Sequence, residues 1–512
     1  MTSPADRDDS ADGGSARADR TLADQDPASL RGLTPRNPPF RRRTARDSAF
    51  HSPASGDAAL HGTTHRTPAE RAEHGRRIRR QVPRSAHAPW IPAADRPDPV
   101  VVLERQAADR LPELLPVRYG RMAAGPLPFL RGAAAVMAGD LAALPHTGLT
   151  VQLCGDAHLL NFGLYATPER ALLFDVDDFD ETYPGPFEWD VKRLAASVAV
   201  AARDSGHTDK EALRAARAGA TAYRVQMRRL AALGELAVWY ERTDAHELLP
   251  LIRSARRRRR FAGTLSHPTH RTELRSLAEL TETAGNGLRR IAPDPPLLEP
   301  AGPSDAAALR KMFSDHRSTI DDDRRRLLDR YRFVDAARKA VGVGGVGVRC
   351  YVVLLTGRDA DDPLLLQLKE ATRSVVEDHT PTRGPHLHAG RRVVCGQRLL
   401  QAADDIFLGW TTGPRGRAFY WRTLRDVQGP SDVVGLPPED LRMHARLCGT
   451  ALARGHARSG DRIAIAGYLG SGDAFDRAIA SFALRYADQT ATDHATLRDA
   501  VAAGVVTAAP GG

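Results

Sequence analysis

Three polar residues in one stretch of the sequence have the types and spacing that phosphoryl transfer requires. Asp156 follows a short apolar run, Asn161 lies five residues later, and Asp178 follows a second apolar run. In that reaction one carboxylate orients the acceptor hydroxyl and takes its proton, while an amide oxygen and a second carboxylate hold Mg²⁺ on the nucleotide phosphates. The spacing therefore predicts Asp156 as the catalytic base and Asn161 and Asp178 as metal ligands.

The acidic run around Asp178 contains more carboxylates than one ion binds. Its sequence is FDVDDFDE, from Phe174 to Glu181. We expect Asp180 to be the second acidic metal ligand, because it lies in the Asp-Phe pattern that follows the second strand. The alternative interpretation of this run is a solvated acidic loop.

A glycine-rich segment further along the chain could cover phosphates. Gly342, Gly344 and Gly347 fit the pattern G-x-G-x-x-G, which occurs both in dinucleotide-binding folds and in kinase glycine loops. A β-branched and aromatic run follows it, from Arg349 to Leu355. A strand on that side favours the kinase type, in which the loop joins two strands. An ordinary hairpin turn is the alternative.

Lysine is rare in this chain, which makes each lysine informative. The sequence has five lysines, and arginine supplies the rest of its basic side chains apart from histidine. The lysines are Lys192, Lys210, Lys311, Lys339 and Lys369. A lysine supplies a compact point charge that the planar guanidinium group does not reproduce.

Lys369 ends the predicted third strand after the glycine run, where a kinase-like fold places its phosphate-binding lysine. We predict Glu377 as its carboxylate partner and Glu370 as a poorer one. The alternative for Lys369 is an exposed lysine at the end of a strand.

Short strands and long helices must position these residues. Apolar runs at 149–154 and 171–176 predict a hairpin-like pair of strands, and 188–203 predicts a helix. Amphipathic spacing predicts helices over 99–120, 127–144 and 304–331, and further helices over most of 208–290 and from Pro437 onward. The block from Phe333 reads as strand, glycine turn, strand, loop, strand and then helix.

The catalytic stretch resembles aminoglycoside phosphotransferases and choline kinase-like enzymes. The resemblance rests on GDAHLLNFG, DDFDE and GPFEWDVKRLAAS. It implies that Asp156 is the catalytic-loop aspartate, that His158 and Asn161 are the second histidine and the asparagine of that loop, and that Asp178 is the metal aspartate. Asp190 matches the aspartate that opens the following helix and braces the loop.

One position departs from the kinase-like pattern. Cys154 stands where these enzymes have a histidine, two residues before the aspartate. Over roughly residues 75–505 the chain also resembles a bacterial family known as domain of unknown function 2252. The shared phrases include LPVRYGRM, RGAAAVMAGDL, GVGVRCYVVLL and AGYLGSGDAFDRAIASFA.

The order of the motifs is inverted with respect to kinase-like chains, which place the glycine loop and lysine before the catalytic aspartate. We therefore predict an α+β, protein kinase-like fold in circularly permuted order. Its parts are a disordered tail over 1–75, a largely helical catalytic lobe over 76–332, a small antiparallel β lobe over 333–430 that cradles the nucleotide, and C-terminal helices over 431–512 that pack on the catalytic lobe.

Composition narrows the class of protein. The chain has 512 residues, 42% of them hydrophobic and 27% charged, and no run approaches the roughly 20 apolar residues of a membrane helix. The acidic, polar N-terminus does not read as a secretory signal, so we expect a cytoplasmic protein. Four widely spaced cysteines give no zinc or disulfide pattern.

These observations predict an ATP- and Mg²⁺-dependent phosphotransferase with a small-molecule hydroxyl acceptor. A nucleotide-binding pseudokinase without turnover, a metal-dependent hydrolase using the acidic run, and a nucleic-acid-binding protein are the alternatives. The last would use the net charge of +10, the tail arginines Arg41–Arg43 and the run Arg256–Arg260. Arg131 could bind phosphate or an acidic substrate, or be structural, and His456 reads as a packing or capping histidine.

Overall fold

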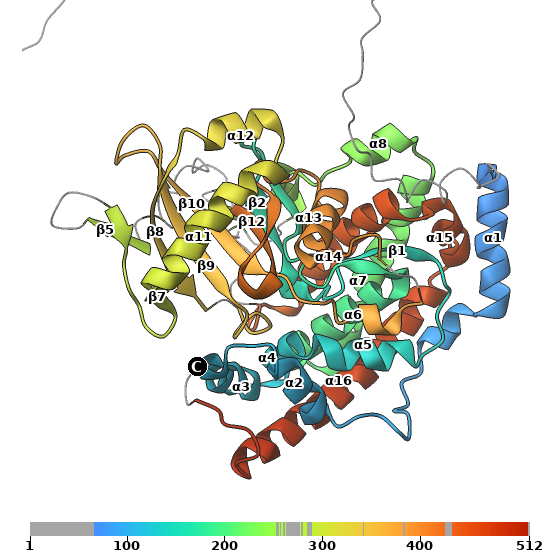
Figure 1. The fold of residues 1–512 in the computed structure, drawn as a ribbon. Coiled ribbons are helices and arrows are strands. Elements are labelled where there is room, and N and C mark those ends of the chain that lie inside the picture. The colour runs from blue at the N-terminus through green and yellow to red at the C-terminus, as the bar shows by residue number, and fades with distance from the viewer. Residues whose placement is uncertain are drawn as a thin grey trace, which may run out of the picture. The chain divides into compact units, whose positions relative to one another are not determined.

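Helices and small antiparallel sheets together make up the described chain (Figure 1). In the computed structural model the described residues are 66–509, apart from 341, 284–288, 382–383, 425–432 and most of 252–279. The mixture of helix with antiparallel strands agrees with the predicted α+β class.

The helices are α1 (Pro68–Gln81), α2 (Pro99–Ala107), α3 (Leu115–Ala123), α4 (Pro126–Gly132), α5 (Ala134–Ala142), α6 (Phe187–Asp204), α7 (Asp209–Ala231), α8 (Glu235–Tyr240), α11 (Pro303–His316), α12 (Asp322–Leu328), α13 (Ala389–Leu400), α14 (Pro438–Ser459), α15 (Arg462–Leu469) and α16 (Ala474–Ala502). The strands are β1 (Thr150–Leu153), β2 (Phe162–Ala166), β3 (Leu172–Val176), β4 (Tyr183–Pro186), β5 (Thr281–Thr283), β6 (Arg289–Ile291), β7 (Leu298–Pro300), β8 (Arg332–Lys339), β9 (Cys350–Thr356), β10 (Pro363–Glu370), β11 (Gly409–Thr412) and β12 (Ala418–Thr423).

Long helices form the larger part of the fold, and α6 lies at its centre. Every residue of α6 from Phe187 to Ala202 is buried, because α7, α14 and α16 pack around it. Alanine and serine at many of its positions allow this close approach from several sides. The predicted helix over 188–203 and the predicted C-terminal helices are therefore present, and they form one apolar core with β1–β4.

The first helix of the described chain packs against one near its end. Helix α1 lies along α15 (Figure 1). Their backbones approach so closely that a Cβ atom on Gly75 would lie 1.9 Å from the Ala464 carbonyl oxygen, and one on Gly467 would lie 2.4 Å from that of Ala72. Because α1 begins at Pro68, helical structure begins upstream of the predicted start near Gly75.

The helices predicted over 99–120 and 127–144 are each divided in two. Pro112 lacks the N–H that a continuous helix needs, and Leu111 before it is extended, as the residue preceding a proline prefers. The second division falls at Ala133, whose φ of −108° and ψ of 34° are not helical. Four short helices, α2 to α5, therefore replace two long ones.

The second part of the fold is a six-stranded antiparallel sheet in the order β11-β12-β10-β9-β8-β7. Helix α11 lies across this sheet (Figure 1), and Phe313 packs with Leu366, Leu368 and Trp421 in a separate apolar cluster. The predicted series of strand, glycine turn, strand, loop and strand corresponds to β8, β9 and β10. The helix predicted directly after β10 is absent from its expected place, since α13 begins only at Ala389.

The two strands beside the acidic residues do not pair with each other, contrary to the prediction. β1 pairs with β4, and β3 pairs with β2, so the expected hairpin is replaced by two separate two-stranded sheets. The segment Pro184–Pro186, whose prolines and glycine are typical of a turn, lies within β4. The residues that follow β1 and β3 still meet, because Asp177 N donates a hydrogen bond to Asn161 O at 3.0 Å.

Several predictions concern residues beyond those that the structure describes. The tail over 1–65, with Arg41–Arg43, and all of the run Arg256–Arg260 except Arg258 and Arg259 are outside them. Within the described ranges, no helix is both long and apolar enough to cross a membrane.

Candidate functional site

The loop that carries Asp156 is held in place by a residue in the first turn of α6. Asp190 accepts hydrogen bonds from Cys154 N at 2.7 Å and from Gly155 N at 3.1 Å. Gly155 has a φ of +82°, and a Cβ atom there would lie 2.1 Å from the Glu181 carbonyl oxygen. Only glycine combines that φ with that contact without strain. Asp190 thus braces the loop through these two hydrogen bonds.

A buried chain of hydrogen bonds continues from Asp190 into the helices. The His456 Nε2 atom lies 3.1 Å from Asp190 Oδ2, and the Tyr223 hydroxyl lies 2.9 Å from His456 Nδ1. All three side chains are buried. His456, on α14, therefore has the packing role that the sequence predicted, and that role includes fixing the candidate loop.

Asp156 itself is half-buried and is held by one arginine of α6. The Arg193 guanidinium donates to Asp156 Oδ1 at 2.7 and 2.9 Å and to the Leu130 carbonyl oxygen at 2.6 Å. Asp156 Oδ2 lies 3.8 Å from His158 Nε2. One carboxylate oxygen is therefore fixed, and the other faces a histidine without a close hydrogen bond.

Arg193 was not predicted from the sequence as a residue of this site. A signal was available, because Asp190 and Arg193 are three residues apart and share one face of a helix. Two residues on that face contact the same turn, one through the backbone of Cys154 and Gly155 and the other through the Asp156 side chain.

The other two residues predicted for this loop are His158 and Asn161, and their contacts lie within or beside the loop. His158 is buried, and burial, followed by the charges of Arg131 and Arg193, lowers its pKa well below the usual value. It is therefore neutral at physiological pH. Asn161 Nδ2 donates to the Asp156 carbonyl oxygen at 2.8 Å, which leaves its amide oxygen for another partner.

Lys369, predicted independently of the acidic run, makes an ion pair with Asp180. Asp180 also accepts a 2.8 Å hydrogen bond from the Tyr420 hydroxyl through its other oxygen. Lys369 and Tyr420 are directly opposite each other on β10 and β12, so their side chains point to the same face of the sheet. The sheet and the acidic segment therefore meet at Asp180.

The next pair of residues on the same face of these two strands extends this contact. Gln367 and Arg422 are also opposite each other, and Arg422 donates to Gln367 Oε1 at 2.7 Å and to the Asp177 carbonyl oxygen at 3.2 Å. Successive residues of β10 thus face opposite sides of the sheet. Leu366 and Leu368 face the apolar cluster under α11, whereas Gln367 and Lys369 face the acidic segment.

The predicted pairing of Lys369 with Glu377 is wrong. Glu377 lies in the short 3₁₀ turn Glu377–His379 and pairs with Arg373 at 3.4 Å. Glu370, the poorer candidate, pairs with Arg349 and Arg417. Because the chain after β10 is a loop rather than a helix, no helical glutamate is presented to the lysine, and Asp180 takes that position.

The electrostatics distinguish Asp178 from Asp180. Burial alone would raise the pKa of Asp180, but Lys369, followed by Tyr420, lowers it below the usual value. Burial and then the neighbouring charge of Asp180 raise the pKa of Asp178. Asp178 Oδ1 accepts only the Asp180 backbone N–H, at 3.0 Å, and the described residues offer Asp178 no ion pair. Asp178 is the carboxylate that would gain most from a cation.

Asp180 therefore fits a metal ion poorly, since a lysine and a tyrosine occupy its two oxygens. Asn161 and Asp178 each keep an oxygen free of contacts that would compete with a metal. Within the described chain, no three His, Cys, Asp or Glu side chains form a metal-binding group. Mg²⁺ commonly takes only one or two protein ligands, together with phosphates and water. The donor set fits Mg²⁺ bound with a nucleotide and does not fit a metal cage made of protein alone.

The glycine segment lies between β8 and β9 and is fastened to the short helices. Arg110 donates to the carbonyl oxygens of Gly344 at 2.8 Å and Val346 at 2.5 Å, and Leu111 N donates to that of Gly347. Gly342 and Gly347 have positive φ, of 54° and 88°. The loop therefore adopts a conformation that glycine favours, and its carbonyl groups point toward Arg110.

The glycine loop also lies beside the end of α4. A Cβ atom on Gly344 would lie 3.2 Å from the Arg131 carbonyl oxygen. Val343 packs in one apolar cluster with Phe129 and Leu497. The segments around Asp156, Lys369 and the glycine loop thus belong to one region of the molecule, to which α4 also contributes.

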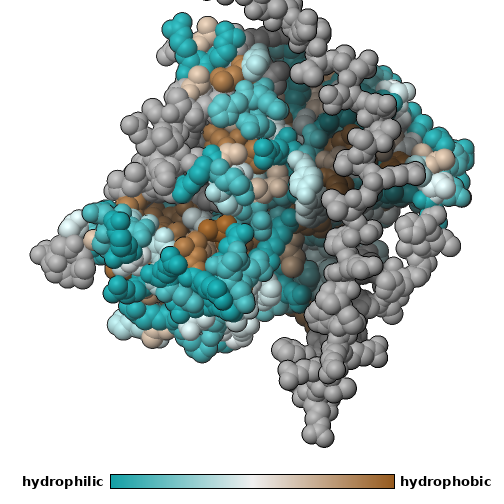
Figure 2. Space-filling view, turned by 90° about the horizontal axis from the view of Figure 1, so that it is seen from above, coloured by the Kyte–Doolittle hydropathy of each residue, from teal (hydrophilic) through white to brown (hydrophobic). Residues whose placement is uncertain are grey.

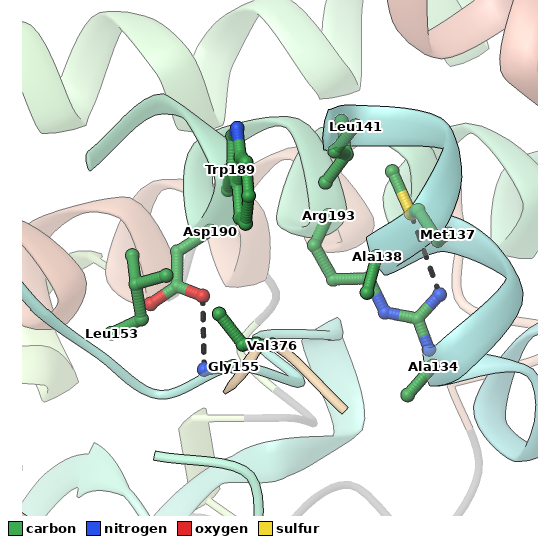
Figure 3. A pocket seen from close by; sticks show the side chains of 10 residues that line it. All are labelled: Ala134, Met137, Ala138, Leu141, Leu153, Gly155, Trp189, Asp190, Arg193 and Val376. Atoms are coloured by element: carbon green, nitrogen blue, oxygen red, sulfur yellow. Dashed lines mark hydrogen bonds between the residues drawn. The ribbon is translucent and has the colours of Figure 1, made fainter. Parts of the chain in front are cut away.

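A small pocket lies behind the Asp156 turn (Figure 3). Most of its lining is apolar, and two of its polar side chains are already bonded: Asp190 to Gly155 N, and Arg193 Nη1 to Met137 Sδ at 3.5 Å. Trp189 also lines the pocket, and its buried Nε1 atom has no hydrogen-bond partner among the described residues. Its volume suits little more than a water molecule. The pocket therefore separates the loop from α5 and α6 and is too small for a nucleotide.

The fold and the site define a mixed helical and antiparallel-sheet protein in which a sheet lysine contacts a buried acidic segment. The chain belongs to the family described as uncharacterized protein conserved in bacteria (DUF2252), whose sequence pattern it matches over residues 110–500. The matched range includes Asp156, Asp178, Lys369 and the glycine loop. No curated protein and no solved structure matches the chain.

Proposed function

We propose that this protein is an ATP- and Mg²⁺-dependent phosphotransferase acting on a small molecule with a hydroxyl group. The observation that carries the proposal is the contact between Lys369 and Asp180, two residues from Asp178. The sequence suggested a lysine with a glycine loop and, separately, an Asp-Asn-Asp set. Their contact supports one shared site, because phosphate-binding and metal-binding groups must reach the same nucleotide.

Asp156 would take the proton of the acceptor hydroxyl. Arg193 fixes Oδ1, so Oδ2 is the oxygen that would face the acceptor. In the transfer step, a bond forms between the acceptor oxygen and the γ-phosphorus while the bond from that phosphorus to the bridging oxygen breaks. ADP leaves and the hydroxyl proton goes to Asp156. The loop held by Asp190 fixes the carboxylate, and fixed geometry contributes much of such catalysis.

Asn161 and Asp178 would hold Mg²⁺ on the phosphates. When bound there, the ion supplies positive charge that neutralises the phosphate oxygens. Lys369 would contribute a second positive charge, which Asp180 and Tyr420 hold in place in the absence of ligand. The backbone of Gly342–Gly347 would cover the phosphates, and Arg110 holds that backbone through the carbonyl oxygens of Gly344 and Val346.

The arrangement also leads us to propose a kinase-like fold in circularly permuted order. Strand β10, which carries the lysine, is flanked by β9 and β12 in an antiparallel sheet, and the glycine loop precedes β9. These features match the predicted nucleotide lobe, although they follow the catalytic loop in the chain. A regulatory module that binds nucleotide without turnover would use the same residues.

Nucleotide binding and turnover by the full-length protein test the proposal. Mg²⁺-ATP binding is measured by calorimetry, and transfer of labelled γ-phosphate is measured over a panel of sugars, amino alcohols and aminoglycosides. We expect wild type to bind Mg²⁺-ATP and modify at least one acceptor, and Asp178→Ala to lose transfer. Asp361→Ala, an exposed acidic residue of the β9–β10 loop, is the matched control and should behave as wild type.

The outcomes separate the alternatives. Binding without transfer over the panel would favour the regulatory module over the phosphotransferase. A wild-type protein that binds no nucleotide, with or without Mg²⁺, would contradict both. Salt-sensitive binding of DNA or RNA in place of nucleotide would support the nucleic-acid-binding alternative.

A further inference from the structure

Arg131, the penultimate residue of α4, is a partly buried cation with no carboxylate in contact. The described residues give its side chain no ion pair and no hydrogen bond, and its Nε atom is buried without a partner. A buried guanidinium N–H that is left unpaired costs free energy, so such groups are normally paired. Arg131 therefore has hydrogen-bonding capacity that the folded chain does not use.

The nearby Arg193 shows how this region pairs an arginine that is structural. Arg193 bonds to Asp156, to the Leu130 carbonyl oxygen and to Met137 Sδ. These contacts occupy Asp156 Oδ1 and fix the residue before Arg131. Arg193 thus has the partners that Arg131 lacks, although the two side chains lie near the same carboxylate.

The charges around Arg131 are those of the candidate site. Burial lowers the pKa of Arg131, and among the neighbours that offset this effect are Asp156 and Asp178. Neither carboxylate is within ion-pair distance of it. The guanidinium therefore lies near enough to interact with the charges of both acidic residues, and it bonds to neither of them.

The backbone places Arg131 on the phosphate side of the site. Its carbonyl oxygen lies beside Gly344 of the glycine loop, and α4 is anchored there because Arg118 donates to the Gly132 carbonyl oxygen at 3.1 Å. A group bound between the glycine loop, Asp156 and Asp178 would meet the Arg131 guanidinium.

We infer that Arg131 binds the oxygens of the γ-phosphoryl group of the nucleotide. The inference rests on the proposed phosphotransferase function and adds a residue from the short N-terminal helices to that site. A guanidinium suits this task because its planar fork can bind two phosphate oxygens at once. Arg131 would hold the group that lies between the catalytic base and the metal-binding aspartate.

A comparison of ATP-type and ADP-type ligands tests the inference. Binding of Mg²⁺ with AMP-PNP, a non-hydrolysable ATP analogue, and of Mg²⁺-ADP is measured for wild type, Arg131→Gln and Arg131→Lys. We expect Arg131→Gln to weaken AMP-PNP binding by about 10- to 100-fold, the usual effect of losing a charge-assisted hydrogen bond, and to leave ADP binding unchanged. Arg131→Lys should recover part of the loss.

Arg105→Gln is the matched control, because it removes one positive charge from an exposed position on α2. It should leave both affinities unchanged. Thermal melting of each variant reports folding, and if Arg131→Gln fails to fold, the comparison is made with Arg131→Lys, whose AMP-PNP affinity should still fall while its ADP affinity does not.

The results distinguish the inference from the proposed function. An equal loss of AMP-PNP and ADP affinity, or no loss of either, would overturn the role of Arg131 while wild-type nucleotide binding stands. Loss confined to binding of the acceptor would assign Arg131 to an acidic acceptor and would also overturn it. A wild-type protein that binds neither nucleotide would overturn both.

Discussion

The Asp156 loop and the glycine loop both lie near the acidic segment, but the chain holds them in different ways. Buried side chains of α6 and α14 hold the Asp156 loop, through Asp190 and Arg193 on α6 and through His456 on α14. Arg110 holds the glycine loop mainly through backbone carbonyl groups, and a Cβ atom on Gly342 would meet no atom within 4 Å. The contrast indicates that the Asp156 loop is held tightly, whereas the glycine loop has open space beside Gly342.

The surface of the molecule differs in character from the candidate site. Figure 2 shows a face that is mainly hydrophilic, with hydrophobic residues visible mostly in recesses between polar side chains. The polar groups of the candidate site instead lie within the fold, on the described side chains of Asp180, Lys369 and Tyr420.

The largest expected effect concerns the Asp156 loop. Asp156→Asn keeps the shape of the side chain and removes the proton acceptor, so phosphotransfer should fall by about 10²- to 10⁴-fold. Nucleotide affinity should change little, because Asp156 is assigned to the acceptor. Steady-state rates and calorimetry provide the two readouts. A large loss of nucleotide affinity with unchanged turnover would reverse the assignment.

A pair of glycine substitutions compares the two loops at matched backbone geometry. Gly155 and Gly342 both have positive φ, but only at Gly155 would a Cβ atom clash with a backbone oxygen. We expect Gly155→Ala to lower the free energy of unfolding by about 3–5 kcal/mol, from overpacking and strain together. Gly342→Ala should cost about 1 kcal/mol, from strain alone. Urea unfolding measures both, and equal losses would remove the contrast.

Breaking the contact between sheet and acidic segment should have a smaller effect on stability. Lys369→Met leaves Asp180, whose side chain is 26% exposed, without its cation. We expect a loss of about 2–4 kcal/mol, somewhat below the full cost for a completely buried pair. Lys339→Met, on the same sheet, is the control.

The double variant Lys369→Met with Asp180→Asn should recover part of the stability, because the uncompensated charge is then removed. No recovery would indicate that the pair contributes little. Calorimetric melting provides the measurement for all of these variants.

The last expected effect concerns pH. Burial, offset only in part by the Val375 N–H and the charge of Arg392, raises the pKa of Glu181 from 4.5 to about 7. The unfolded chain loses this proton near pH 4.5, whereas the folded chain keeps it until about pH 7, so stability falls as pH rises through that window. Glu181→Gln should flatten the curve of unfolding free energy between pH 4.5 and 7. An unchanged curve would assign the slope to other groups.

Local patterns in the sequence predicted the elements near the site better than their pairing. The strand before Asp156, the helix after Asp178 and the strand that ends at Lys369 are all present, because alternation and amphipathic spacing report local structure. The pairing of β1 with β4 could not be read, since β4 contains Pro184 and Pro186 and resembles a turn. Proline is rarely found inside strands.

The site was predictable where a residue type was rare or a motif was specific. Lysine scarcity singled out Lys369, and the kinase-like resemblance singled out Asp190. The partner of Lys369 was not predictable, because Asp180 lies 189 residues away in the sequence and nothing local connects them. Arg110 and Arg193 did not stand out in the sequence, because arginine is common throughout the chain.

The close packing of α1 on α15 has a consequence for synthesis. Helix α1 leaves the ribosome well before α15, because the backbone that it touches at Ala464 and Gly467 is made nearly four hundred residues later. Domains generally fold as units, and long-range contacts form slowly. Until α15 has been made, the nascent α1 therefore lacks the helix against which it packs in the described structure.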